Sequence, residues 1–183
     1  MAFVKITSID QLNKNLNLGP GYGGYDEFFH AIELPKSEWE NFCTWRDNRY
    51  TRNCISACDE YELLLMCWQK EHSSPIHSFQ FQEGWIKVLE GELTIQNYEI
   101  DRDKSCCHKK GSLTLKAGES TYLNDNMGFH QITNSFYNST VSLHLNIERV
   151  VKWEVFRACR QEIVFVHPLL DSKSADCEVQ FKR

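Results

Sequence analysis

Three histidines in the strand-rich part of the sequence are the residues best suited to bind a metal ion. His77, His130 and His144 each follow or lie within an apolar pattern, where a polar side chain is costly unless it has a partner. One such histidine alone is more often a hydrogen-bonded part of the structure than a ligand. Three together are more informative, because neutral imidazole is the commonest metal ligand and a barrel with inward-facing histidines forms a natural pocket for a metal.

The residues around these histidines form two motifs. Residues 74–77 (Ser-Pro-Ile-His), 83–85 (Glu-Gly-Trp) and 90–92 (Glu-Gly-Glu) resemble the first motif of the cupin superfamily. Residues 118–130, which contain Gly-Glu, Asn-Asp and Gly-x-His, resemble the second motif with its single histidine. The first motif normally contains His-x-His, because residues two apart on a strand point to one face and both rings reach one ion.

Further blocks narrow the resemblance to one family. Blocks at residues 50–53 (Tyr-Thr-Arg-Asn), 65–68 (Leu-Met-Cys-Trp), 76–77, 123–130 and 141–145 look like those of cysteine dioxygenases, in the same order and with similar gaps. Five weak blocks in order make a strong signal for the family. The resemblance implies a cupin barrel that uses non-haem Fe(II) and O2 to oxidise the thiol of cysteine to a sulfinate.

The resemblance also implies roles for individual residues. His77 matches the first iron ligand of the family and His130 matches the last. Arg52, with Tyr50 beside it, matches the arginine that binds the substrate carboxylate. A planar guanidinium suits that role because it can make two parallel hydrogen bonds to a carboxylate.

Three positions depart from the family pattern. Phe79 stands at the second histidine of His-x-His, so an apolar ring replaces a ligand. Ser142 and His144 match the serine and histidine that hold an active-site tyrosine, but Asn146 stands at the tyrosine position. Gly84 stands where some members have a cysteine that is cross-linked to this tyrosine, so no thioether can form by that route. His144 would then serve as a buried hydrogen-bonding group or hold a water in the pocket.

Glu83 is the candidate for the missing metal ligand. Strand parity from His77 through Phe79 puts Glu83 on the same face, and two histidines with one carboxylate suit non-haem Fe(II). A bulge in this segment would change the parity. The alternative, in which Glu83 faces solvent or caps the hairpin, therefore stays open.

These residues predict a thiol dioxygenase that acts on cysteine or a related small thiol carboxylate, with O2 as co-substrate and Fe(II) as a cofactor, held weakly if only two histidines bind it. The alternative is a cupin that binds a small carboxylate through Arg52 without turning it over, and Phe79 and Asn146 favour it. A third hypothesis is an iron enzyme with a different reaction.

The elements that must position these residues fall into a helical part and a strand-rich part. Ser8 and Gln11 form a capping-box pattern for one helix, and Ser37 begins a second short helical pattern. From about residue 61, short apolar segments recur between turn residues. Segments 85–90 and 92–98 flank Gly91 like a hairpin.

We therefore expect a mainly β, cupin-type β-barrel (double-stranded β-helix or jelly roll) with short N-terminal helices. The expected organisation is a single domain over residues 1–183, with the helices within about 1–48 and the barrel over about 50–170.

Composition and charge argue against several classes. The chain has 183 residues, enough for a core of its own, and a net charge of −5, which argues against a nucleic-acid binder. It has no apolar run of the roughly 18–20 residues that a membrane span needs, and no apolar signal segment follows Met1. We expect a cytoplasmic protein without a membrane or nucleic-acid partner, and a monomer is favoured.

The eight cysteines are scattered along the chain. In a chain large enough to fold without disulfides, this scatter favours reduced thiols in the cytoplasm. Cys106, Cys107 and His108 lack the two-residue gap of a zinc motif and are expected to lie in a surface loop.

Overall fold

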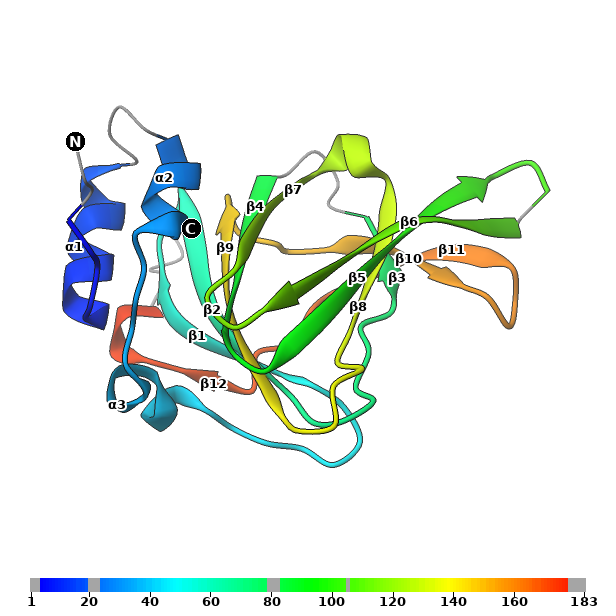
Figure 1. The fold of residues 1–183 in the computed structure, drawn as a ribbon. Helices are drawn as coiled ribbons and strands as arrows, with labels where there is room; N and C mark the ends of the chain where they lie inside the picture. Colours follow the sequence, from blue (N-terminus) through cyan, green and yellow to red (C-terminus); the bar gives the residue numbers. More distant parts are fainter. Residues whose placement is uncertain (1–3, 20–23, 79–82, 105, 178–183) are drawn as a thin grey trace.

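The computed structural model describes residues 4–19, 24–78, 83–104 and 106–177. Helices cover one side of a β-structure that makes up the rest of the molecule (Figure 1). The helices are α1 (Ile9–Leu18), α2 (Gly24–His30) and α3 (Lys36–Trp39), with short 3-10 helices η1 (Glu40–Phe42), η2 (Asp125–Met127) and η3 (Ala175–Cys177). The strands are β1 (Thr51–Ala57), β2 (Tyr61–Trp68), β3 (Ile76–His77), β4 (Glu83–Glu90), β5 (Glu92–Asp101), β6 (Cys106–Lys116), β7 (Ser120–Asn124), β8 (Phe129–Thr133), β9 (Thr140–Ile147), β10 (Trp153–Arg157), β11 (Glu162–Val166) and β12 (Ser172–Lys173).

The described strands form two six-stranded sheets. The first sheet has the order β12-β1-β2-β9-β4-β7 and the second has the order β11-β10-β3-β8-β5-β6. Neighbouring strands are antiparallel except for β1 and β12, which are parallel. The mainly β expectation is confirmed, but these strands are hydrogen-bonded as two sheets and not as one closed ring.

Strand β2 shows why the first sheet is buried on both faces. Leu63 and Leu65 belong to the core under the N-terminal helices, whereas Leu64 and Met66 belong to the core between the two sheets. Successive side chains of a strand point to opposite faces, so a strand covered on both sides has a continuous apolar sequence. This explains the uninterrupted apolar run that precedes residue 68.

The first predicted helix is confirmed, and the start of the second needs correction. Ser8 caps α1 by accepting a hydrogen bond from the Gln11 backbone N–H, and the Gln11 side chain accepts one from the Thr7 N–H. The second helical pattern forms α3 followed by η1, but Ser37 lies within α3 and is not its cap. The sequence analysis missed α2.

The predicted hairpin around Gly91 is wrong in its pairing. Strands β4 and β5 do flank Gly91, but β4 pairs with β7 and β9 while β5 pairs with β6 and β8. Gly91 has a φ of 86°, and an added Cβ would lie 3.0 Å from the Ser139 carbonyl oxygen. The chain turns at this glycine from one sheet to the other, which strand patterns alone do not distinguish from a hairpin.

Two expectations about cysteines are also corrected. Cys106 and Cys107 lie in β6 and not in a loop, because they pair with Asp101 and Ile100 of β5. Cys54 of β1 and Cys177 of η3 are joined by a disulfide, contrary to the expected reduced thiols. The two cysteines are 123 residues apart in the sequence, so spacing did not indicate that they meet.

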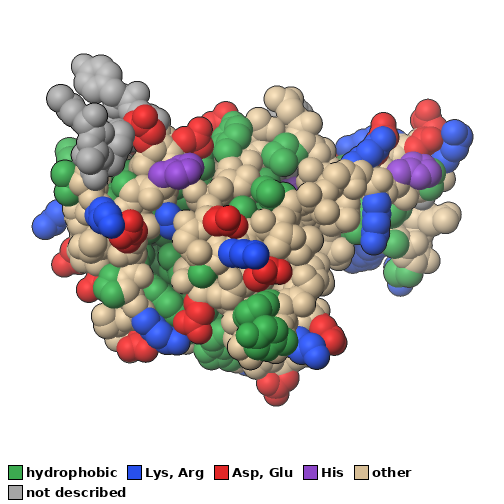
Figure 2. Space-filling model, viewed as in Figure 1, with side chains coloured by type: hydrophobic (Ala, Val, Ile, Leu, Met, Phe, Trp, Pro, Cys, Tyr) green, Lys and Arg blue, Asp and Glu red, His purple; other side chains and the backbone are tan. Residues whose placement is uncertain are grey.

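The surface carries charges of both signs. Figure 2 shows acidic and basic side chains interspersed over the visible face, without one extended region of a single sign. Within the described ranges, no helix has the length and apolar character required to cross a membrane.

Candidate active site

His77 and His130 come together at the pairing of β3 with β8. They are direct cross-strand partners, and their ring centroids are 4.3 Å apart. Both side chains are buried. The expected meeting of these two histidines is therefore realised, through strands that are more than fifty residues apart in the sequence.

Burial keeps the histidines of the site neutral. Desolvation lowers the pKa of His77 to about 4, with the nearby Arg52 charge contributing, and it lowers the pKa of His130 well below its usual value. The Pro75 carbonyl accepts a hydrogen bond from His77 Nδ1 at 2.8 Å, which leaves the ring lone pair on Nε2. Neutral imidazole is the form that binds metal ions.

Arg52 lies in the same pocket and has a buried carboxylate as its partner. Arg52 Nη2 donates to Glu62 Oε1 at 3.2 Å, and Asn146 Nδ2 donates to the same oxygen at 2.8 Å. Asn146 is the cross-strand partner of Glu62 in the β2–β9 pair. Asn146, at the family's tyrosine position, thus binds the partner of Arg52. The sequence analysis missed Glu62, although a glutamate before the apolar run of β2 was a visible signal.

Aromatic rings line the pocket between Arg52 and the histidines. The Trp153 ring lies 4.5 Å from the His77 ring, and the Arg52 guanidinium lies 5.0 Å from the Trp153 ring centroid. Tyr50 stacks on Trp68 at 4.4 Å, and burial raises the pKa of Tyr50 above its usual value, so this phenol stays protonated. Tyr50 joins Arg52 as expected, whereas Trp153 was not singled out from the sequence.

Ser142 and His144 form a buried chain with Trp68. Trp68 Nε1 donates to Ser142 Oγ at 2.9 Å, and Ser142 Oγ shares a hydrogen bond of 2.8 Å with His144 Nε2. Desolvation, with the nearby Arg52 charge contributing, lowers the pKa of His144 to about 3. His144 is a buried hydrogen-bonding group of the pocket wall, as the sequence suggested.

The complete wall of this pocket combines polar groups with large apolar side chains. The lining residues are Tyr50, Arg52, Leu64, Met66, Trp68, Ser74, His77, Ser78, Ile132, His144, Asn146, Val150 and Trp153.

Glu83 is not brought to the histidines. Its side chain is exposed and accepts a hydrogen bond from the Tyr122 hydroxyl at 2.7 Å. Trp85 and Lys87, which share its strand parity, bind Asp26 and the Phe29 carbonyl of α2, so this face of β4 is the outer, helix-covered face. Of the two alternatives for Glu83, the structure supports the solvent-facing one and not the metal ligand.

The other altered positions have different outcomes. Phe79 lies outside the described residues. Gly84 is buried in β4 and is the cross-strand partner of Asn146 and Leu123. Across the described ranges, no group of three or more His, Cys, Asp and Glu side chains could hold a metal ion. The described donor set for a metal is therefore the pair of neutral imidazoles of His77 and His130.

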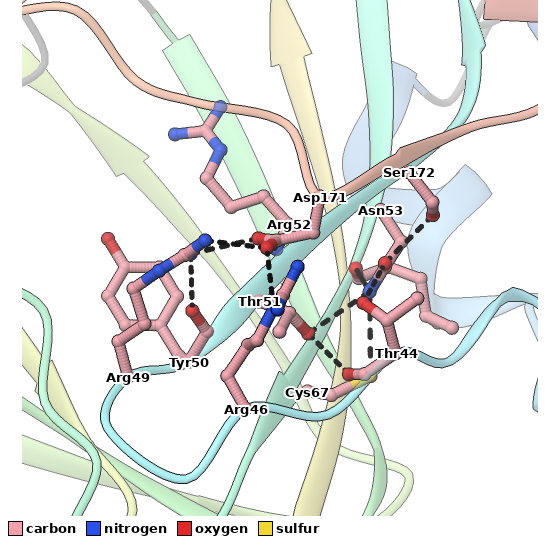
Figure 3. Close-up of polar contacts among 11 residues, drawn as sticks. Thr44, Arg46, Arg49, Tyr50, Thr51, Arg52, Asn53, Cys67, Asp171 and Ser172 are labelled. Atoms are coloured by element: carbon pink, nitrogen blue, oxygen red, sulfur yellow. Dashed lines mark hydrogen bonds and ion pairs between the residues drawn. The ribbon is translucent and has the colours of Figure 1, made fainter.

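A second polar cluster holds the start of β1, which carries Arg52. The buried Asp171 carboxylate accepts two hydrogen bonds from Arg49, at 2.6 and 2.9 Å, and one from the Arg52 backbone N–H at 3.1 Å. Figure 3 shows Asp171 facing Arg49 across the first residues of β1. Burial alone would raise the pKa of Asp171, but the hydrogen bonds from Arg49 and Arg52 lower it below its usual value. Asp171 thus fixes the segment from which Arg52 reaches into the pocket.

The arrangement of strands defines the fold as a double-stranded β-helix of the cupin type. A conserved protein with a double-stranded β-helix domain from Klebsiella pneumoniae superposes with a TM-score of 0.50 at 11% sequence identity, over 70% of this chain and 94% of that one. This similarity concerns the fold alone, and it confirms the expected cupin-type fold.

The sequence comparison then gives the family. The sequence model of "Cysteine dioxygenase type I" matches residues 26–157, so the chain belongs to the cysteine dioxygenase family. It is 31% identical to cysteine dioxygenase type 1 of Rattus norvegicus over 118 residues and 30% identical to the human protein over the same length. These matches span 63% of this chain and 59% of each of the two relatives. The family predicted from the five sequence blocks is confirmed.

Proposed function

We propose that this protein is a non-haem Fe(II) thiol dioxygenase that converts cysteine, or a related small thiol carboxylate, to its sulfinate. The observation that carries the proposal is the direct pairing of His77 with His130 beside a pocket that contains Arg52. Family membership supports the reaction class. In the reaction the sulfur takes up both atoms of O2, so no further reductant is needed.

The residues present suit a weakly held iron ion. His77 and His130 are buried, neutral and adjacent, and they would be its protein ligands. When bound, Fe(II) would supply the redox chemistry between the thiol and O2. Two protein ligands leave coordination positions for a substrate thiol and amine as well as for O2.

The chain's own groups bind and orient the substrate. Arg52 Nε is buried and has no hydrogen-bond partner among the described residues, so it is a donor available to a substrate carboxylate. Tyr50, Trp68 and Trp153 surround this donor with aromatic surface, which excludes water and strengthens the interaction. His144 and Ser142 keep the wall behind the substrate hydrogen-bonded.

A second candidate function is a cupin that binds a small carboxylate without oxidising it. The described donor set of two imidazoles and the presence of Asn146 at the tyrosine position favour this alternative. It shares Arg52 with the first candidate, so carboxylate binding alone does not separate the two.

Iron content and O2 uptake do separate them. We expect protein purified without O2 and supplied with Fe(II) to retain iron, and to consume O2 only when cysteine is added. His77→Ala and His130→Ala should each lose the iron and the uptake, whereas His167→Ala, which removes an exposed histidine outside the pocket, should keep both. Protein that retains no iron and takes up no O2 would favour the carboxylate-binding alternative.

A further inference from the structure

Glu62 is a buried acid placed directly behind the substrate pocket. Its side chain is 3% exposed and the Arg52 side chain is 5% exposed, so the ion pair between them is almost fully removed from water. Glu62 lies on the inner face of β2, the face that also carries Leu64 and Met66 into the core between the sheets. The proposed reaction gives no role to this acid.

The position of Glu62 changes the charge of the pocket. Arg52 contributes one positive charge and Glu62 one negative charge, and the two side chains are joined by an ion pair of 3.2 Å. At the end of the pocket that receives the polar end of the substrate, these two side chains together therefore add no net charge. A ligand whose polar end has a net negative charge loses its hydration when it enters the pocket. The pocket offers no unpaired positive charge in return, so binding of this ligand costs free energy.

Two hydrogen bonds hold the Glu62 carboxylate against the Arg52 guanidinium. Glu62 Oε1 is shared by Arg52 Nη2 and Asn146 Nδ2, so the carboxylate is held from two strands and faces the guanidinium. A carboxylate that approaches Arg52 finds Nη2 already bonded to Glu62 and Nε still available. The guanidinium is a hydrogen-bond donor to the ligand but no longer an unpaired cation.

We propose that Glu62 is a specificity-determining residue, which makes the pocket disfavour thiols whose polar end has a net negative charge. The favoured thiols have a zwitterionic or uncharged polar end, with an oxygen acceptor for Arg52 Nε. This inference rests on the proposed function for the position of the thiol, but the charge selection itself depends only on Arg52, Glu62 and Asn146.

The test compares two thiols that differ in the amino group. Cysteine has a zwitterionic polar end and 3-mercaptopropionate has a carboxylate alone. We expect calorimetry under anaerobic conditions to give a Kd for 3-mercaptopropionate about tenfold higher than the Kd for cysteine, which corresponds to about 1.4 kcal/mol. In Glu62→Gln, which keeps an oxygen acceptor, we expect the ratio to approach one through tighter binding of 3-mercaptopropionate.

Glu60→Gln is the matched control. It makes the same chemical change at an exposed residue just before β2, and it should leave the ratio unchanged. If Glu62→Gln had only a general structural effect, it would weaken the binding of both thiols equally and leave the ratio of their Kd values unchanged. If that variant does not fold, the wild-type comparison still decides, because equal or tighter binding of 3-mercaptopropionate overturns the inference.

The outcome is separable from that of the proposed function. A ratio that shifts in Glu62→Gln, in a protein that takes up no O2, would support the charge selection and reject the dioxygenase. The role of Glu62 would be overturned if the wild type takes up O2 with cysteine but the ratio of the two Kd values is the same in the wild type and in Glu62→Gln. It would also be overturned if the wild type binds neither thiol measurably.

Discussion

Several buried polar residues of the pocket have a specific hydrogen-bond partner. His77 donates to the Pro75 carbonyl, Ser142 lies between Trp68 and His144, and Arg52 lies beside Glu62. A buried polar group without such a partner would cost free energy. These hydrogen bonds therefore fix the orientation of the side chains in the pocket wall, while burial keeps the histidine rings neutral.

At the scale of single residues, the ligand position taken by Phe79 gives the first prediction. Phe79→His restores the His-x-His pattern with His77, and we expect it to raise the iron retained after dialysis, because a third imidazole adds a metal ligand. Gln80→His is the matched control, because it adds the same imidazole outside the His-x-His pattern. Equal iron content in Phe79→His and the wild type would contradict a metal site at His77.

The buried neutral histidines give a prediction for pH. In the metal-free protein the pKa of His77 is about 4 and that of His144 about 3, whereas both are about 6.5 in the unfolded chain. At pH values between the folded-state and unfolded-state pKa values, the unfolded chain binds more protons than the folded protein. The free energy of unfolding should therefore decrease as the pH falls from about 6.5 to about 4. Urea titrations across this range measure the slope.

The control for this slope is an exposed histidine. His167→Gln, which removes an exposed ring outside the pocket, should leave the slope unchanged. His144→Gln should reduce the slope, because burial lowers the pKa of this ring. A free energy of unfolding that stays constant between about pH 6.5 and 5 would be inconsistent with neutral, buried histidines.

At the scale of elements, the site depends on how the ends of strands are held. The chain before β12 runs along β1, where the Asp171 backbone N–H donates to the Arg52 carbonyl at 2.7 Å and the Asp171 side chain accepts from Arg49 (Figure 3). The pocket arginine therefore lies on a strand whose start is fixed by the last part of the chain. Local sequence patterns could not predict the contact between Arg52 and Asp171, because the two residues are 119 positions apart in the sequence.

Asp171→Asn tests this connection. We expect the free energy of unfolding to decrease by about 1–3 kcal/mol, because the substitution removes a charged acceptor from Arg49 and the Arg52 backbone. We also expect weaker carboxylate binding at Arg52. Asp59→Asn, at an exposed turn residue between β1 and β2, should change neither quantity. A variant as stable as the wild type would mean that Asp171 does not hold β1.

The disulfide gives a second prediction at this scale. Cys54–Cys177 joins β1 to η3 across 123 residues, and closing so long a loop restricts the unfolded chain. We expect Cys177→Ala to lower the free energy of unfolding by about 2–5 kcal/mol. Cys159→Ala, at an exposed free cysteine, should have little effect. Identical stability of Cys177→Ala and the wild type would show that the disulfide does not contribute.

At the scale of the whole molecule, the sequence predicted the fold class, and it singled out several residues that line the pocket, among them Arg52, His77 and His144. Strands could be predicted from local sequence, because a strand buried on one face has alternating apolar residues and a strand buried on both faces has a continuous apolar run. The pairing of β4 with β9 rather than β5, and the disulfide, were missed because they join segments that local patterns do not relate. Glu62 was missed because its importance lies in its contact with Arg52 across two strands, and spacing does not encode that contact.

The proposed function is that this chain transfers both atoms of O2 to the sulfur of a small thiol. Mass spectrometry of the product formed from cysteine, Fe(II) and isotope-labelled O2 tests the claim most directly. We expect cysteine sulfinate with the label at both sulfinate oxygens, and we expect His77→Ala to form no sulfinate. No sulfinate, or sulfinate with unlabelled oxygen, from protein that has retained iron would contradict the account.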